Sequence, residues 1–212
     1  MAAEAERLEL KIDLPDRSGQ RALALATLTP RQLIAAILQE FDEVDYLGTT
    51  VDPYVLVNAE DGSILDPSLP LRGQLGATAR LTLREHEVAV PEGAQRPART
   101  AYLRETATGA VYKVNWLPAL IGRPDRNQPH DDLCVDLESH PSGMRVSRRH
   151  AQLTAHNGEF YLEALSSNPT LLRREQETIP ASSERIALQP GDIIVLARSD
   201  ISLKFILLEQ DD

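Results

Sequence analysis

The residues best suited to chemistry in this sequence lie between Arg145 and Ala151, in the stretch RVSRRHA. This stretch combines several guanidinium groups with the short hydroxyl of Ser147, and further candidates are Arg123 and the polar run 166–168. A planar guanidinium, a hydroxyl donor and an amide are the groups that hold a phosphate-sized anion and the chain that carries it. We therefore predict an anion site, provided that the fold brings these segments together.

No other set of reactive residues indicates a catalytic or metal site. Cys134 and four histidines lack the paired spacing of metal ligands, so we expect no metal and no cofactor. Ser147 and His150 have no third group to orient the imidazole and no oxyanion site, which argues against a hydrolase. We therefore predict that the protein is not an enzyme. The four histidines are His130, His140, His150 and His156.

The composition is that of a globular protein with two domains. The 212 residues are 42% hydrophobic, and a net charge of -10 argues against binding to nucleic acid or to an anionic membrane surface. No apolar run approaches the ~18 residues of a membrane helix. The N-terminal stretch has no apolar signal core, and a single cysteine cannot form an internal disulfide. These features favour a cytoplasmic protein without membrane insertion.

The pattern of residues 1–90 predicts an α+β domain. Residues 8–14 and 21–26 alternate apolar and polar positions around a turn, as in a hairpin. Thr29 and Pro30 then begin a helix, in which apolar residues recur at helical spacing through residue 41. Three further strands follow, at residues 54–58, 64–65 and 79–84.

This order of elements resembles the ubiquitin-like β-grasp fold over residues 8–86. It is most similar to the ubiquitin-like domains found with bacterial type VII secretion components. The chain has no diglycine tail, so the resemblance implies a docking surface for a second protein rather than conjugation. The acidic loop 42–53 carries Thr49 and Thr50. Acid-flanked threonines suit a Ser/Thr kinase, although a solvated acidic loop is the simpler interpretation.

Residues 91–98 contain proline and glycine without periodicity, which predicts a linker. Residues 99–212 then show short strands separated by turns, the pattern of a β-sandwich. Because the loops of a sandwich gather at its ends, distant residues can share one rim. The predicted strands are at residues 101–105, 111–114, 119–122, 133–137, 150–155, 160–164, 171–173, 186–188, 193–196 and 202–208.

Five ordered pieces of the second half closely resemble the forkhead-associated (FHA) domain, over about residues 99–209. The pieces are Ile121–Arg123, Val135–Leu137, Val146–Ala151, Ser167–Asn168 and Leu188–Ile193. The resemblance implies an all-β sandwich that binds phosphothreonine peptides and is not an enzyme.

The resemblance also assigns roles to individual residues. Arg123 is expected to contact the phosphopeptide, Ser147 to donate a hydrogen bond to the phosphate, and Arg148 to add charge beside it. Ser167 and Asn168 are expected to hold the loop beside the phosphate and the backbone of the peptide. Contacts of this kind with a phosphate of nearly two charges suggest roughly micromolar affinity, which suits reversible signalling.

Two residues are expected to support the site without contacting the ligand. Gly122 would allow close packing before the arginine, and His150 would brace the binding loops from inside. Selectivity for the residues of the peptide would lie in the loops Pro124–Asp132 and Pro169–Ser183.

One step departs from the family pattern, because Asn168 is followed by Pro169 where a glycine is usual. Proline removes an N–H group and biases Asn168 towards extended backbone. Two hypotheses remain open. The first is a bacterial adaptor that binds a phosphothreonine protein of a Ser/Thr kinase pathway. The second is a structural scaffold whose sandwich has lost phosphate recognition and associates with unphosphorylated protein or with itself.

Overall fold

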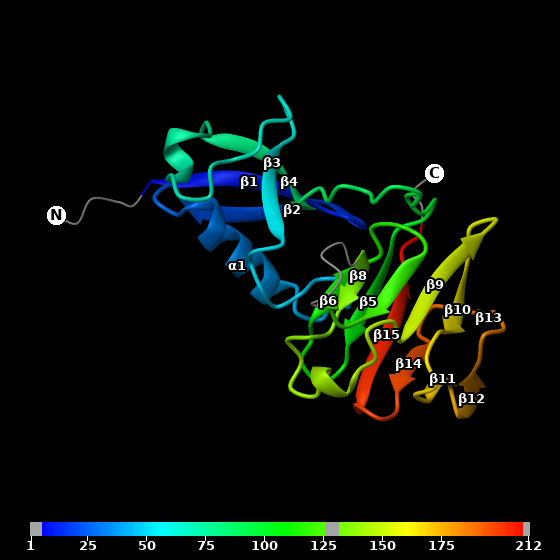
Figure 1. The fold of residues 1–212 in the computed structure, drawn as a ribbon. Coiled ribbons are helices and arrows are strands. Elements are labelled where there is room, and N and C mark those ends of the chain that lie inside the picture. Colours follow the sequence, from blue (N-terminus) through cyan, green and yellow to red (C-terminus); the bar gives the residue numbers. More distant parts are fainter. Residues whose placement is uncertain (1–5, 126–131, 210–212) are drawn as a thin grey trace. The chain divides into compact units, whose positions relative to one another are not determined.

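The computed structural model describes residues 6–125 and 132–209 (Figure 1). The chain divides into two compact units, residues 6–87 and the described residues from 88 to 209, and each is treated by itself. Within the described residues no helix is long and apolar enough to cross a membrane.

The first unit is a four-stranded sheet with one α-helix against it (Figure 1). The strand order is β2-β1-β4-β3; β1 and β4 run parallel, whereas β1–β2 and β3–β4 are antiparallel pairs. The predicted stretch 64–65 forms only a single bridge, between Ile64 and Val57. The other predicted elements are confirmed: β1 Arg7–Leu14, β2 Arg17–Leu25, α1 Pro30–Glu40, β3 Tyr54–Asn58 and β4 Thr78–Glu85, with a short 3-10 helix η1 at Leu71–Gly73.

Helix α1 begins where the sequence predicts. The Thr29 hydroxyl accepts from the backbone N–H of Gln32, and the Gln32 side chain accepts from the N–H of Thr29, while Pro30 occupies the first turn. The helix buries Leu33, Ile34, Ile37 and Leu38, and alternate residues of β1 are buried as well. This apolar layer is the core of the first unit.

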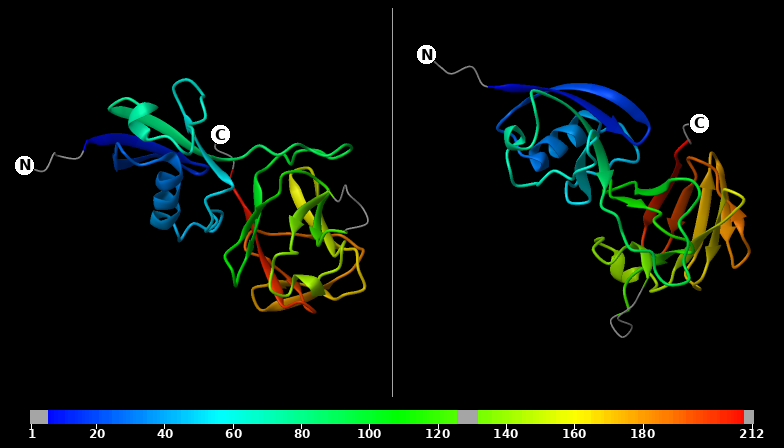
Figure 2. Two further views of the ribbon diagram at one scale, coloured as in Figure 1. Left: turned by 60° about the vertical axis from the view of Figure 1, so that its left-hand side comes forward. Right: turned by 90° about the horizontal axis from the view of Figure 1, so that it is seen from above.

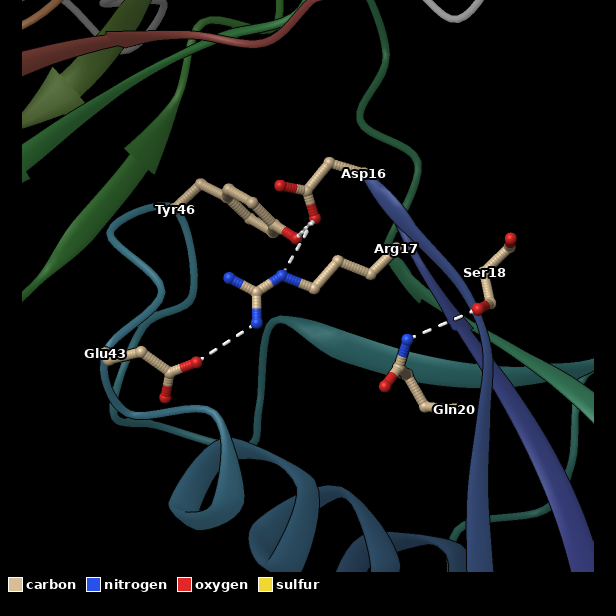
Figure 3. A network of polar contacts seen from close by, with 6 residues as sticks. All are labelled: Asp16, Arg17, Ser18, Gln20, Glu43 and Tyr46. Carbon is tan, nitrogen blue, oxygen red and sulfur yellow. Dashed lines mark hydrogen bonds and ion pairs between the residues drawn. The ribbon is translucent and has the colours of Figure 1, made fainter.

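The acidic loop after α1 is fastened to the β1–β2 turn by polar contacts (Figure 3). The Tyr46 hydroxyl donates to Asp16, and Arg17 forms an ion pair of 3.1 Å with Glu43. The Arg17 guanidinium also lies 5.9 Å from the centre of the Phe41 ring, a cation–π distance. Tyr46 is buried, so these contacts hold the loop in one place.

The second unit is a β-sandwich, and Figures 1 and 2 show its two sheets. One sheet has the order β13-β10-β9-β7-β8 and the other β12-β11-β14-β15-β5-β6. The strands are β5 Ala101–Glu105, β6 Val111–Lys113, β7 Ala119–Gly122, β8 Leu133–Asp136, β9 Ala151–His156, β10 Glu159–Ala164, β11 Thr170–Arg174, β12 Glu177–Ala181, β13 Ile186–Ala187, β14 Ile193–Leu196 and β15 Ile201–Leu207, with a 3-10 helix η2 at Gly143–Arg145.

Apolar residues from both sheets form one buried core between them. Phe160 of one sheet and Phe205 of the other lie at the centre, with ring centroids 5.4 Å apart. The pair is tilted, which is a favourable arrangement for two aromatic rings. Every strand predicted in this half is present within one or two residues. The core therefore fixes a rigid frame for the loops at its ends.

The structure corrects one prediction about selectivity. The segment Pro169–Ser183 is not a loop, because β11 and β12 form an antiparallel hairpin there. Glu175 makes the turn with a φ of 51°, in the left-handed region. The sequence did not indicate β12, because this edge strand contains Pro180 and its residues do not alternate between buried and exposed positions. The other predicted selectivity segment, Pro124–Asp132, includes residues 126–131, which lie outside the described residues.

The segment 91–98 is ordered against the second unit. The backbone N–H of Gln95 donates to the Leu117 carbonyl at 3.0 Å, and the Leu117 N–H donates back to Gln95 at 2.8 Å. Two reciprocal bonds of this kind make an isolated antiparallel bridge. The segment is therefore held at this point, although its composition is that of a linker.

Candidate functional site

The candidate site is built from three connections at one end of the sandwich: the end of β7, the β8–β9 loop and the β10–β11 loop. Gly122 ends β7, and the β8–β9 loop passes directly over it. A β-carbon at Gly122 would lie 1.9 Å from the Arg148 carbonyl oxygen, closer than any real contact. Gly143 plays the same part inside the loop, where a β-carbon would lie 2.0 Å from the Leu137 carbonyl oxygen. Both positions require glycine.

Arg123 is half-buried and joins β7 to the loop that carries Ser147. Its Nε atom donates to the Val146 carbonyl at 2.9 Å, and its backbone N–H donates to the Ser147 carbonyl at 3.3 Å. Val146 is buried and anchors this part of the loop in the core. Arg123 and Ser147, which are far apart in the sequence, are thus neighbours.

His150 ties the loops together from inside the fold. Its side chain is fully buried, and Nδ1 accepts a hydrogen bond of 3.3 Å from the backbone N–H of Ser147. Its backbone N–H donates to the Ile121 carbonyl, and its own carbonyl accepts from Leu165 and Ser166. Burial lowers the pKa of His150, which favours the neutral ring that can accept at Nδ1. The ring proton is then on Nε2, which has no partner among the described residues.

Asn168 lies between two of the other site residues. Its Nδ2 atom donates to the Ser147 Oγ atom at 2.8 Å, and its Oδ1 atom accepts from Arg198 at 2.8 Å. The backbone N–H of Asn168 is capped by the Ser166 hydroxyl at 3.2 Å. Both ends of the Asn168 amide are therefore engaged within the protein.

The structure brings three of the predicted site residues together and leaves the other two outside this group. Arg123, Ser147 and Asn168 are brought together by the contacts above. Arg148 is exposed but forms an ion pair of 3.2 Å with Asp125, so part of its charge is compensated. Ser167 is exposed, and the neighbouring Ser166, which was not predicted, is the serine that organises the loop.

Arg198 is a residue of the site that the sequence did not indicate. It lies in the turn between β14 and β15, 30 positions after Asn168, and no local pattern links the two. With Arg145 and Met144, Arg198 lines a pocket of about 470 Å³. All three side chains are exposed, and neither arginine forms an ion pair within the described part of the chain. Arg145 is part of the predicted stretch 145–151, but the pocket that it lines with Arg198 forms only in the folded chain.

Within residues 6–125 and 132–209, no three or more His, Cys, Asp or Glu side chains could hold a metal ion. Ser142 lies 3.0 Å from His140 Nδ1, but its hydroxyl donates to the Ser199 carbonyl and so fastens two loops together. Cys134 is half-buried, and burial raises the pKa of its thiol.

The fold and these contacts define a class of protein, a β-sandwich with an arginine, a serine and an asparagine gathered on the loops at one end. Residues 119–197 match the family model of the FHA domain. This part of the chain is an FHA domain, as the motifs predicted. No curated protein sequence is similar enough to the chain to count as a match.

Several solved structures are similar to about half of the chain. EmbR from Mycobacterium tuberculosis, in complex with a low-affinity phosphopeptide, is 26% identical; the match covers 54% of this chain but only 26% of that chain, with a TM-score of 0.40. The FHA domain of human APLF, in complex with an XRCC1 bisphospho peptide, is 22% identical over 51% of this chain and 99% of that chain, with a TM-score of 0.37. A structure described as part of a study of phosphothreonine-dependent FHA domain interactions is 21% identical over 52% and 99% of the two chains, with a TM-score of 0.40.

Proposed function

We propose that the chain is a non-catalytic adaptor that binds phosphothreonine-containing segments of partner proteins in a Ser/Thr kinase pathway. The observation that supports this proposal is the meeting of Arg123, Ser147 and Asn168 at one end of an FHA domain. No described group accepts the hydroxyl proton of Ser147, so this proton is available to a phosphate oxygen. We further propose that the protein acts in a bacterial cytoplasm.

A phosphopeptide titration tests this function. We expect a degenerate phosphothreonine peptide library to bind the full chain, and the same peptides without phosphate not to bind. Arg123→Ala should weaken binding by about tenfold or more, because a hydrogen bond to a charged group contributes about 1.5–3 kcal/mol. If the unaltered protein binds phosphorylated and unphosphorylated peptides equally, the proposal is wrong.

The pocket lined by Met144, Arg145 and Arg198 supports a proposal about the residues beside the phosphothreonine. Two exposed guanidinium groups on a protein of net charge -10 favour an anionic partner. Because Arg198 also contacts Asn168, the pocket adjoins the proposed phosphate site. An acidic side chain close to the phosphothreonine fits this arrangement.

The engagement of Asn168 supports the alternative function. Its amide is bonded to Ser147 and Arg198, so it would have to exchange a partner to hold the backbone of a peptide. A scaffold that associates with unphosphorylated protein or with itself would not need that exchange. Binding that survives both dephosphorylation of the partner and Arg123→Ala would support the scaffold.

For the first unit we propose a ubiquitin-like β-grasp domain that docks a second protein. The mixed sheet β2-β1-β4-β3, with β1 and β4 parallel and α1 following the first hairpin, supports this assignment. We propose residues 1–90 and 99–212 as the two domains, joined by residues 91–98. Thr49 and Thr50 are exposed and accessible to a kinase. Mass spectrometry after kinase treatment tests this, and two unmodified threonines would contradict it.

A further inference from the structure

We propose that Arg198 is a positioning residue of the phosphate site, which sets the orientation of the Asn168 amide and thereby directs the Ser147 hydroxyl towards the ligand. The inference rests on the proposed phosphothreonine binding and adds a residue outside the motifs that predicted it. Arg198 acts through Asn168 and is not itself required to touch the phosphate.

The three residues form a continuous chain of hydrogen bonds. Arg198 donates from NH1 to Asn168 Oδ1 at 2.8 Å, and Asn168 donates from Nδ2 to Ser147 Oγ at 2.8 Å. Both distances are short for N–H···O bonds. The chain crosses from the β14–β15 turn through the β10–β11 loop to the β8–β9 loop.

The turn that carries Arg198 is fixed in place. The backbone N–H of Ala197 donates to the Pro169 carbonyl at 3.1 Å, which ties the turn to the residue after Asn168. Ser199 is buried, and its hydroxyl donates to the Leu196 carbonyl at 3.0 Å. The Ser142 hydroxyl donates to the Ser199 carbonyl and so links the turn to the β8–β9 loop. Arg198 therefore reaches Asn168 from a well-supported backbone.

The polarity of the chain follows from the chemistry of arginine. A guanidinium group carries only donors, so the atom of Asn168 that faces Arg198 must be the oxygen. The nitrogen of the amide must then face Ser147, where it occupies an acceptor position of the hydroxyl oxygen. The hydroxyl proton cannot point at this N–H group and is left for the phosphate.

Loss of Arg198 would remove the hydrogen bond that holds the Asn168 amide in this orientation. The Asn168 amide could then turn by half a rotation and present its oxygen to Ser147. In that state the hydroxyl would donate to Asn168 rather than to a phosphate oxygen, and the site would lose one charge-assisted hydrogen bond. Such a loss corresponds to a Kd about 10- to 100-fold weaker.

A mutant cycle on the full chain tests the inference. The probe is a phosphothreonine peptide with alanine at all flanking positions, so that no acidic side chain enters the pocket. We expect Arg198→Ala to weaken binding about tenfold in the natural chain. In the Ser147→Ala background Arg198→Ala should have only the effect of one lost charge. Arg198→Lys should retain most of the affinity, because an ammonium group is also only a donor.

Arg145→Ala is the matched control. It removes the same charge from the same pocket but has no bond to Asn168, so its effect should be small and equal in the two backgrounds. If Arg198→Ala weakens binding equally with and without Ser147, Arg198 acts through charge alone, and the inference is overturned.

An NMR measurement without ligand separates this inference from the proposed function. Contacts between the side-chain amide protons of Asn168 and the β-protons of Ser147 should appear in the natural chain and in Arg145→Ala, and should be lost in Arg198→Ala. Their persistence in Arg198→Ala would refute the positioning role, whatever the peptide titrations show. If no peptide binds but the contacts depend on Arg198, the phosphothreonine function fails and the orientation of Asn168 by Arg198 is upheld.

Discussion

Gly122→Ala should disable the candidate site without altering the side chains of Arg123, Ser147 or Asn168. The added β-carbon would lie 1.9 Å from the Arg148 carbonyl oxygen and 3.0 Å from that of Ser147. Since real β-carbons essentially never come within 3.0 Å, the end of β7 and the β8–β9 loop must separate by the difference, about 1.1 Å. Both obstructing atoms belong to backbone, so no side-chain rotation relieves the clash.

The separation acts directly on the contacts that place Ser147. The bond between the Arg123 N–H and the Ser147 carbonyl is already 3.3 Å long and would break. Overpacking and the lost hydrogen bond together should lower the free energy of unfolding of the second unit by about 2–4 kcal/mol. Phosphopeptide affinity should fall by about tenfold or more, because Ser147 no longer lies beside Arg123.

Tryptophan fluorescence provides the assay for stability. Trp116 is the single tryptophan, it is buried in the second unit, and its emission during urea unfolding reports on that unit. Gly73→Ala controls for the substitution itself, because a β-carbon there meets no atom within 4 Å; since Gly73 lies in the first unit, the unfolding curve reported by Trp116 should not change. If Gly122→Ala leaves both the unfolding curve and the peptide affinity unchanged, the close approach of the loop to β7 does not exist in solution.

Three further predictions concern charges in the second unit. Asp192→Ala should destabilise this unit by about 3–5 kcal/mol in urea unfolding, because Asp192 is buried and Arg174 would lose bonds of 2.9 and 2.7 Å to it; a loss below about 1 kcal/mol would contradict it. His150, whose pKa burial lowers, takes up a proton more readily when unfolded, so its contribution to stability should be complete above about pH 6.5 and lost as the pH falls through its folded pKa. Unfolding curves between pH 7.5 and 5.5 should show a steeper decline for the natural chain than for His150→Asn, and equal slopes would refute this. Arg145→Ala should reduce the preference for an acidic residue beside the phosphothreonine in a peptide array, whereas an unchanged preference would exclude the pocket from recognition.

Local sequence patterns were sufficient to predict most of the secondary structure. Alternation of apolar residues predicted β1 and the strands of the sandwich, because successive side chains of a strand point to opposite faces of the sheet, one buried and one exposed. Thr29 and Pro30 predicted the start of α1 because their chemistry acts within one turn. The edge strand β12 escaped prediction, since Glu177–Ala181 buries too little to show the alternation.

The residues of the candidate site could be found from local motifs, whereas their partners could not. The sequence by itself predicted that Arg123, Ser147 and Asn168 belong to one site, because they lie in ordered motifs of the FHA domain, and the structure brings them together. The close packing of Gly122 was also foreseen from the motif. What the tertiary structure alone decided was the set of partners: Arg148 with Asp125, and Asn168 with Arg198. These pairs join loops that are distant in the chain, and only the closure of the sandwich brings such loops to one end.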